Sequence, residues 1–265
     1  MAETAKHRTP RAEIGNILPR NDNMIAIASG KSGVGKTWFA VTLATALSAL
    51  KQKTLFFDAD LGLSNIDIQL GLGTSHDMDC VVTGKTTLNQ IIRYSEKAHF
   101  DVIAGRGGSR GLGTMPVGRL QILAEDLSFL SSGYDKVLLD IGAGINKSAL
   151  ILSGMAGRLI ILCTDEPSSL TEAYALIKKV SDQYPKCRIS IVVNQSVSVQ
   201  DGQRTYDILR KACQNFLKVT PPLLGIVRRD TRIRDAIRNQ MPLLARYPSS
   251  EAAVDVVNIA RKLQK

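Results

Sequence analysis

The sequence predicts an α/β fold in which a mostly parallel, twisted sheet carries helices on both faces. Short apolar runs, expected to be buried strands, alternate with longer segments that show helical periodicity. The first run leads through a glycine-rich loop directly into a helical segment. Two later runs end in aspartates, which is typical of strands whose carboxyl ends line the ligand crevice of an open sheet.

Length and composition indicate one domain and exclude several protein classes. Of the 265 residues, 1–23 are charged and poor in apolar side chains, so we expect a flexible tail followed by a single domain over 24–265. No apolar run approaches the ~20 residues that cross a membrane, and residues 1–23 lack the apolar centre of a signal peptide. Four scattered cysteines without a C-x-x-C pair indicate reduced thiols in a cytoplasmic protein. The net charge of +10 favours anionic partners: lipid headgroups, nucleic acid or an acidic protein.

The glycine-rich loop spans residues 30–37 and has the sequence GKSGVGKT. It follows the expected strand 24–29 and precedes the expected helix 38–50, which is the context of a phosphate-binding P-loop. Its glycines let backbone N–H groups turn toward a phosphate, and the helix N-terminus adds positive potential. We expect the nucleotide to contact Gly30, Lys31, Ser32, Gly33, Val34, Gly35, Lys36, Thr37 and Trp38. Lys36 would neutralise the β- and γ-phosphates, and the Thr37 hydroxyl would bind Mg²⁺.

A second lysine, Lys31, follows the first glycine of this loop. A solvated loop lysine is one interpretation, because an ordinary P-loop needs only Lys36. The run from Lys31 to Thr37 also resembles the deviant Walker A motif of the MinD/ParA ATPases, K-G-G-x-G-K-[ST], with Ser32 where glycine is usual. That resemblance implies a P-loop NTPase fold of the SIMIBI type, binding of ATP and Mg²⁺, and an ATP-dependent homodimer. In the family this lysine reaches the partner subunit's nucleotide, so the resemblance gives Lys31 a catalytic role beside Lys36.

The segment after the P-loop helix predicts a second strand over 53–57 and then an acidic loop. The loop pattern D-x-D-x-G-x-x-N-x-D over 58–67 resembles the family's switch I. The resemblance implies that Asp60 positions the attacking water and that Asp58 lies near the magnesium shell. Helix or turn capping is the alternative role for Asp58 and Asp67.

The middle of the chain predicts two short helices joined by a turn over 74–94 and a strand over 100–104. A second glycine-rich stretch, 105–113, is expected to be a surface loop, because it lacks a following helix start with a lysine. Leucines at helical spacing predict a helix over 120–130.

A further apolar run, 134–140, predicts a strand that ends at Asp140. Hydrophobic positions that end in an aspartate have Walker B chemistry, in which the carboxylate holds Mg²⁺. Glycines follow Asp140 and can move when the γ-phosphate leaves. Asp140 therefore resembles the switch II aspartate, and the alternative is a strand-terminal turn.

Two segments indicate a subfamily. A strand over 158–163 precedes residues 164–179, where Ser168 or Ser169 is expected to cap a helix. This segment, and residues 241–253, resemble the flagellar-number branch of the MinD-like ATPases, the FlhG/FleN type. The resemblance implies control of flagellar number, placement or assembly. It also implies a signal-recognition-particle-type flagellar GTPase, or a flagellar switch or regulator protein, as partner. The tail shows no match to the D-Q-A-x-x-L-R segment of many flagellar members.

The last third of the chain predicts strands over 188–195 and 223–227. Asn194 ends the first of them, and the family implies that it pairs with adenine, although turn formation would also explain it. Arg228 follows the last strand where the family usually has a nearby proline, so its adenine contact departs from the pattern. Helices are expected over 202–216, with Tyr206, Leu209, Cys213 and Phe216 along one face, and over 233–239.

A final helix begins after Ser249 or Ser250, and we expect it to dock on the domain and not to insert into a membrane.

A nucleoid-binding ParA-type positioning ATPase is the alternative function, since it has the same nucleotide site. Nucleic acid is then a possible partner, less favoured than a protein, and basic residues near the last strand could contact phosphates: Arg228, Arg229, Arg232, Arg234 and Arg238. Peripheral contact with an anionic membrane at its inner face is also compatible with the charge.

Overall fold

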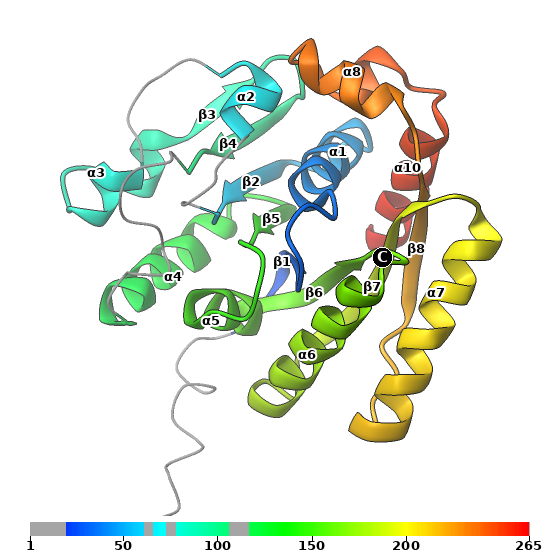
Figure 1. Cartoon of the computed structure of the whole chain (residues 1–265). Helices are drawn as coiled ribbons and strands as arrows, with labels where there is room; N and C mark the ends of the chain where they lie inside the picture. Colours follow the sequence, from blue (N-terminus) through cyan, green and yellow to red (C-terminus); the bar gives the residue numbers. More distant parts are fainter. Residues whose placement is uncertain (1–19, 61–65, 73–77, 106–116, 265) are drawn as a thin grey trace, which may run out of the picture.

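The computed structural model describes residues 20–60, 66–72, 78–105 and 117–264, which form an eight-stranded sheet with helices on both faces (Figure 1). The strands are β1 (Asn21–Ser29), β2 (Thr54–Asp58), β3 (Arg93–Ser95), β4 (Phe100–Ile103), β5 (Lys136–Asp140), β6 (Ala156–Cys163), β7 (Arg188–Ser196) and β8 (Leu223–Arg228). The helices are α1 (Lys36–Ala49), α2 (Ile66–Leu70), α3 (Met78–Val82), the 3₁₀-helix η1 (Leu88–Ile91), α4 (Val117–Ser131), α5 (Lys147–Met155), α6 (Pro167–Gln183), α7 (Val199–Ala212), the π-helical turn η3 (Cys213–Leu217), α8 (Arg232–Arg238), α9 (Leu243–Arg246) and α10 (Glu251–Leu263).

The strand order β3-β4-β2-β5-β1-β6-β7-β8 confirms the predicted mostly parallel sheet. Only β3 runs antiparallel to its neighbour among the described strands. Strands β2 to β5 lie on one side of β1, and strands β6 to β8 lie on the other side. The direction in which the chain adds strands to the sheet therefore reverses at β1. Ligand crevices of open α/β sheets form at such a point. Asp140 is in register with Ile27 of β1 and Asp58 of β2, which brings three strand ends together.

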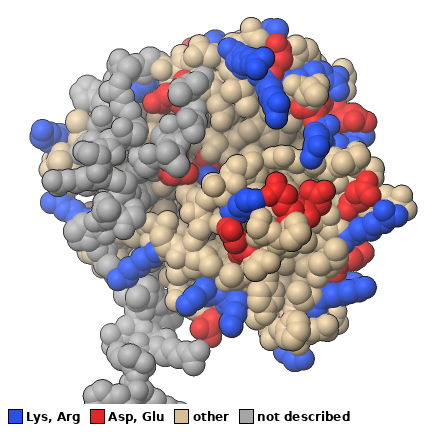
Figure 2. All heavy atoms as spheres, in the orientation of Figure 1, with Lys and Arg blue, Asp and Glu red and all other residues tan. Residues whose placement is uncertain are grey.

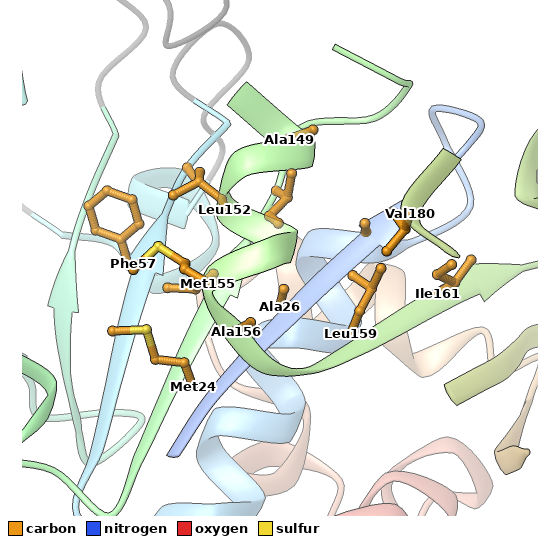
Figure 3. Close-up of a cluster of buried hydrophobic side chains, with 14 of the residues drawn as sticks. Met24, Ala26, Phe57, Ala149, Leu152, Met155, Ala156, Leu159, Ile161 and Val180 are labelled. Carbon is orange, nitrogen blue, oxygen red and sulfur yellow. The ribbon is translucent and has the colours of Figure 1, made fainter. Parts of the chain in front are cut away.

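Each face of the sheet has its own apolar layer. Alternate residues of β1 point to opposite layers: Met24 and Ala26 to one, Ile25 and Ile27 to the other. Figure 3 shows the first layer, where Leu152 and Met155 of α5 lie over β1 and β2. Helices α4 to α7 cover this face, and α1 and α10 cover the opposite one. Burial of each large apolar side chain stabilises the fold by about 1.5–3 kcal/mol, so β1 is anchored on both faces.

The last helix, α10, docks on the domain as expected. Ser250 caps it by accepting a hydrogen bond from the backbone N–H of Ala253 at 3.2 Å. Its residues Val256, Ile259 and Leu263 are buried in the layer that α1 shares. Within the described ranges, none of the helices combines the length and the apolar composition that a membrane crossing needs.

Several element boundaries differ from the sequence prediction. Strand β1 begins at Asn21 and not at Met24, because polar side chains there find partners: Asn21 donates to the Ser131 hydroxyl at 2.5 Å, and Asn23 to the Ser131 carbonyl at 2.8 Å. Residues 21–23, which were expected to belong to the tail, are therefore part of β1. Residues 1–19 lie outside the described part. The same holds for residues 106–116, which include most of the second glycine-rich stretch.

Three further elements correct the prediction. Helix α5 was not expected, and Asn146 caps it by accepting from the Ala149 N–H at 2.7 Å. Helix α6 is capped neither by Ser168 nor by Ser169, because Glu166 is the N-cap and Pro167 opens the helix. Phe216 does not face the core: it is 76% exposed, since the chain changes to π-helical geometry at Cys213.

Candidate nucleotide-binding site

The P-loop joins β1 to α1 at the switch point of the sheet. Gly33 (φ 78°) and Gly35 (φ 86°) adopt the left-handed conformation that side chains disfavour. Gly35 is the N-cap of α1 and offers no side-chain cap, and the first turn has no acidic residue. The N–H groups of this turn are therefore available to an anion, which the helix N-terminus also attracts.

Helix α6 packs directly against the start of the P-loop. A Cβ at Gly30 would lie 2.4 Å from the backbone carbonyl carbon of Glu172 in α6 and 2.5 Å from its Cβ. Real Cβ atoms do not approach backbone so closely, so only glycine permits this contact. Gly30 thereby fixes the distance between the phosphate loop and α6.

We expect Gly30→Ala to destabilise the protein by about 1–3 kcal/mol, because the new methyl group must push α6 away from the loop. Thermal melting should show a decrease of several degrees. The matched control is Gly118→Ala in the first turn of α4, where an added Cβ meets nothing within 4 Å. Equal melting temperatures for the two variants would contradict the close packing.

The end of β7 holds the other side of the P-loop. The Asn194 amide is 2% exposed, donates to the Val34 carbonyl at 2.7 Å and lies over Gly35, where a Cβ would meet its nitrogen at 2.6 Å. Gln195 donates to the Gly33 carbonyl at 3.3 Å. Asn194 thus supports the loop in this structure, and its pairing with adenine stays a prediction. No sequence motif pointed to Gln195.

Three charged side chains meet below the loop. Lys36 is 7% exposed and donates a hydrogen bond to the Asp140 carboxylate, which is fully buried. The Lys36 ammonium also lies 3.8 Å from the Asp60 carboxylate. Burial raises the pKa of Asp140, whereas Lys36 and a hydrogen bond from Thr37 favour its ionised form. The structure therefore brings together Lys36, Thr37, Asp60 and Asp140, while their roles toward nucleotide and metal stay predictions.

Asp58 orients the neighbouring Asp60. Asp58 is buried, and its Oδ1 accepts a hydrogen bond from the Asp60 backbone N–H at 3.0 Å. On the other side, Gly142 lies so close that a Cβ there would be 3.2 Å from Asp60 Oδ1. The carboxylate of Asp60 is thus positioned between the end of β2 and the loop after β5.

The residues present fit a magnesium ion bound together with nucleotide phosphates. Asp140 Oδ2 is buried and has no hydrogen-bond partner in the part of the chain that the structure describes, so together with the Thr37 hydroxyl it is a candidate metal ligand. Among the described residues, no cluster of three or more His, Cys, Asp or Glu side chains could hold a metal ion. Mg²⁺ is usually held by one or two carboxylates, waters and substrate phosphates, so a cage of protein ligands is not needed.

Lys31 points away from the phosphate cradle. Its ammonium forms an ion pair with Glu166 and donates to the Ser168 hydroxyl at 2.9 Å. Both charged groups are well exposed, at 33% and 59%, so this pair contributes at most about 1 kcal/mol. No sequence pattern predicted this role of Glu166 and Ser168, because the pairing depends on the approach of α6 to the P-loop.

Two predicted site residues contact other elements. The indole of Trp38 is buried and lines a pocket beside α8. The Arg228 guanidinium binds Asp255 at 2.8 Å and Glu251 at 2.6 Å, both in α10. The described contacts therefore do not bring the Arg228 side chain to the P-loop. Ser32 is exposed at the loop tip, and Val34 is buried under it.

Comparisons with known proteins agree with this geometry. Residues 25–243 match the CbiA family model, which is described as the CobQ/CobB/MinD/ParA nucleotide binding domain. The chain is 30% identical over 240 residues to the antiactivator FleN of Pseudomonas aeruginosa, covering 91% of this chain and 85% of FleN. It is 28% identical over 241 residues to the flagellum site-determining protein YlxH of Helicobacter pylori, covering 91% and 81%.

A solved structure has the same fold. The septum site-determining protein MinD of Pyrococcus horikoshii, in complex with Mg-ADP, superposes with a TM-score of 0.78 at 23% identity. The similarity covers 92% of this chain and 97% of that protein.

Proposed function

The chain belongs to the CobQ/CobB/MinD/ParA family of nucleotide-binding proteins, and we propose that it is an ATP-dependent dimerising switch that regulates flagellar number, placement or assembly. The main support for a dimerising switch is the second P-loop lysine, Lys31. Its ammonium contacts Glu166 and Ser168 of the neighbouring segment and not the phosphate-binding loop to which it belongs. Similarity to FleN and YlxH along nine tenths of the chain supports the flagellar role.

The arrangement of charges supports slow ATP hydrolysis. Asp60 would orient a water molecule toward the γ-phosphate, while Lys36 would balance the charge that develops on the phosphate oxygens; the closeness of the two side chains, 3.8 Å, supports this. Magnesium held by Thr37 and Asp140 would neutralise further phosphate charge. When ATP binds, the Lys36 ammonium would leave Asp140 for the phosphates, and the Asp140 carboxylate would then be available to the metal. Slow turnover suits a protein whose product is a change of partner.

The partners follow from the same proposal. The ATP-bound form is a homodimer in which Lys31 of each subunit reaches the other subunit's nucleotide. A signal-recognition-particle-type GTPase or a flagellar regulator then binds one nucleotide state better than the other, which is the condition for a switch. The protein works in the cytoplasm, and its charge of +10 supports a peripheral contact with the anionic inner face of the membrane.

Asp60→Ala is expected to bind ATP normally but to hydrolyse it at least about a hundredfold more slowly. The attacking water loses its orienting carboxylate, while the phosphate-binding loop is unchanged. Phosphate release measures hydrolysis, and size-exclusion chromatography should show an accumulated ATP-bound dimer. The matched control is Asp207→Ala, which removes an exposed carboxylate of α7. Normal ATP turnover by Asp60→Ala would contradict a catalytic role and leave Asp60 with only a structural role in the turn.

The flagellar role is tested in cells of the source organism. Deletion of the gene should change the number or position of flagella seen by electron microscopy, and the Asp60→Ala allele should not restore the normal pattern. An unchanged flagellar pattern after deletion would remove this part of the proposal and leave the ATPase switch intact.

A further inference from the structure

Two neighbouring amide side chains at the end of β7 hold the P-loop from one side. The Asn194 amide donates a hydrogen bond to the Val34 carbonyl at 2.7 Å, and the Gln195 amide donates one to the Gly33 carbonyl at 3.3 Å. The Gln195 nitrogen also lies close to Gly35, where an added Cβ would meet it at 3.6 Å. Two successive peptide units of the P-loop are thus tied to a strand that follows about 160 residues later in the chain.

A β-bulge allows both amides to reach the loop. In a regular strand, consecutive side chains point to opposite faces of the sheet. The register between β7 and β8 shifts here, because the three steps from Val193 to Ser196 oppose the two steps from Ile226 to Arg228. Gln195 lies within this bulge and has a φ of 58°, a left-handed conformation that side chains disfavour. Bulges and strained residues of this kind occur next to functional sites, where they redirect a side chain.

The two hydrogen bonds also determine where the opposite sides of these peptide units point. In a trans peptide unit, the C=O and the following N–H point in opposite directions. The Val34 carbonyl faces Asn194, so the Gly35 N–H points away from β7. The Gly33 carbonyl faces Gln195, so the Val34 N–H points away from β7 as well. Neither N–H has an acceptor among the residues that the structure describes, so both are free to bind an anion.

These local donors matter because the charge on this face of the molecule is mixed. The loop leads into α1 near the middle of the view in Figure 1, and Figure 2 shows basic and acidic side chains interspersed over the described part of the same face. Lys36, the cation expected to reach the β- and γ-phosphates, is already bound to Asp140. The orientation of the loop N–H groups is therefore an important part of the affinity for phosphate.

We infer that Gln195 is a positioning residue for nucleotide binding, and that with Asn194 it forms an amide clamp on the P-loop. The clamp holds the N–H groups of Val34 and Gly35 in the orientation that phosphate requires, so the loop need not be ordered when the ligand binds. The clamp acts on the polyphosphate of a nucleotide and not on its base, which differs from a pairing of Asn194 with adenine. The inference rests on nucleotide binding by the P-loop, and it requires neither dimerisation nor a flagellar role.

A polyphosphate without a base separates this role from recognition of adenine. The full-length protein is loaded with ADP that carries a fluorescent group on its ribose, and unlabelled ADP or inorganic tripolyphosphate, each with Mg²⁺, displaces it. Gln195→Ala should weaken both competitors by the same factor, about threefold to tenfold, because one hydrogen bond to the loop is lost. Gln203→Ala removes an exposed glutamine of α7, and this matched control should bind both competitors as the unaltered protein does.

Two further substitutions distinguish positioning from a general structural role. Gln195→Glu keeps the size of the side chain, but its carboxylate cannot donate to the Gly33 carbonyl. It should therefore weaken both competitors more than Gln195→Ala does, while Gln203→Glu, with the same change of charge, should not. Gln195→Gly removes the amide but accepts the left-handed backbone without strain. It should melt at a higher temperature than Gln195→Ala and yet bind both competitors at least as weakly.

Asn194→Ala tests the other half of the amide clamp and should weaken ADP and tripolyphosphate equally. A loss with ADP alone would assign Asn194 to adenine and overturn its place in the clamp. For Gln195, unchanged affinities, a loss confined to ADP, or a recovery of affinity together with stability in Gln195→Gly would each overturn the inference and leave the proposed function intact. If the unaltered protein bound neither competitor, the P-loop assignment would fail, and this inference with it.

Discussion

Lys36→Ala is expected to reduce ATP binding below detection by calorimetry. Lys36 is the buried cation of the P-loop, and a charge-assisted hydrogen bond to phosphate contributes about 1.5–3 kcal/mol for each phosphate oxygen that it serves. The structure adds a second consequence, because Lys36 also neutralises the fully buried Asp140. Removing one member of a buried pair costs about 3–5 kcal/mol, so the variant should also melt at a lower temperature.

The two effects can be separated with one further substitution. The double variant Lys36→Ala, Asp140→Asn no longer has the uncompensated buried charge, so it should recover much of the lost stability. Its affinity for ADP, measured in EDTA, should not recover. Lys51→Ala, two residues beyond the C-terminal end of α1, is the matched control and should bind normally. Unchanged nucleotide affinity in a folded Lys36→Ala variant would overturn the P-loop assignment.

Lys31→Ala is expected to leave ATP binding by the monomer nearly intact but to remove ATP-dependent dimerisation and hydrolysis. In the structure Lys31 contacts Glu166 and Ser168, so its own P-loop does not depend on it. A dimer that brings two nucleotides face to face buries several phosphate charges, and Coulomb interactions there are several-fold stronger than in water. Lys31 from each subunit would supply the missing positive charge.

Light scattering with ATP in the Asp60→Ala background measures this effect without interference from hydrolysis. Glu166→Gln is the matched control, since it removes the carboxylate that holds Lys31 but keeps the lysine. That variant should dimerise at least as well as its parent, because the exposed ion pair is weak and its loss frees Lys31. Full dimerisation of Lys31→Ala, Asp60→Ala would exclude a role in trans.

Sequence patterns were reliable where one local requirement dominates. The strands β1, β2, β5 and β6 are apolar because both faces of a parallel sheet are covered, and short apolar runs with clear polar or glycine boundaries can be recognised in the sequence. The P-loop has a fixed spacing because its glycines and lysine must surround one phosphate group. Asp58 and Asp140 could be predicted to lie close together because they end strands that meet at one edge, and Asp60 follows Asp58 by two residues.

Sequence patterns failed where neighbouring elements compete for the same residues. Helix α5 lies between a glycine-containing loop and β6 in an almost continuously apolar stretch, so periodicity could not separate helix from strand. Strand β1 extends to Asn21 because Ser131 of α4 satisfies its polar side chains, and that contact is remote in sequence. Ser168 resembled a helix cap, yet its hydroxyl accepts a hydrogen bond from Lys31.

The sequence by itself thus determined the sheet, the phosphate-binding loop and the acidic groups around it, since each depends on a short pattern with its own physical cause. Only the tertiary structure decided what the remaining side chains do. Lys31 contacts Glu166, Arg228 contacts α10, and the Trp38 indole enters the pocket beside α8. These roles arise where helices distant in sequence pack against the P-loop and the sheet, and no local pattern encodes which of them will meet.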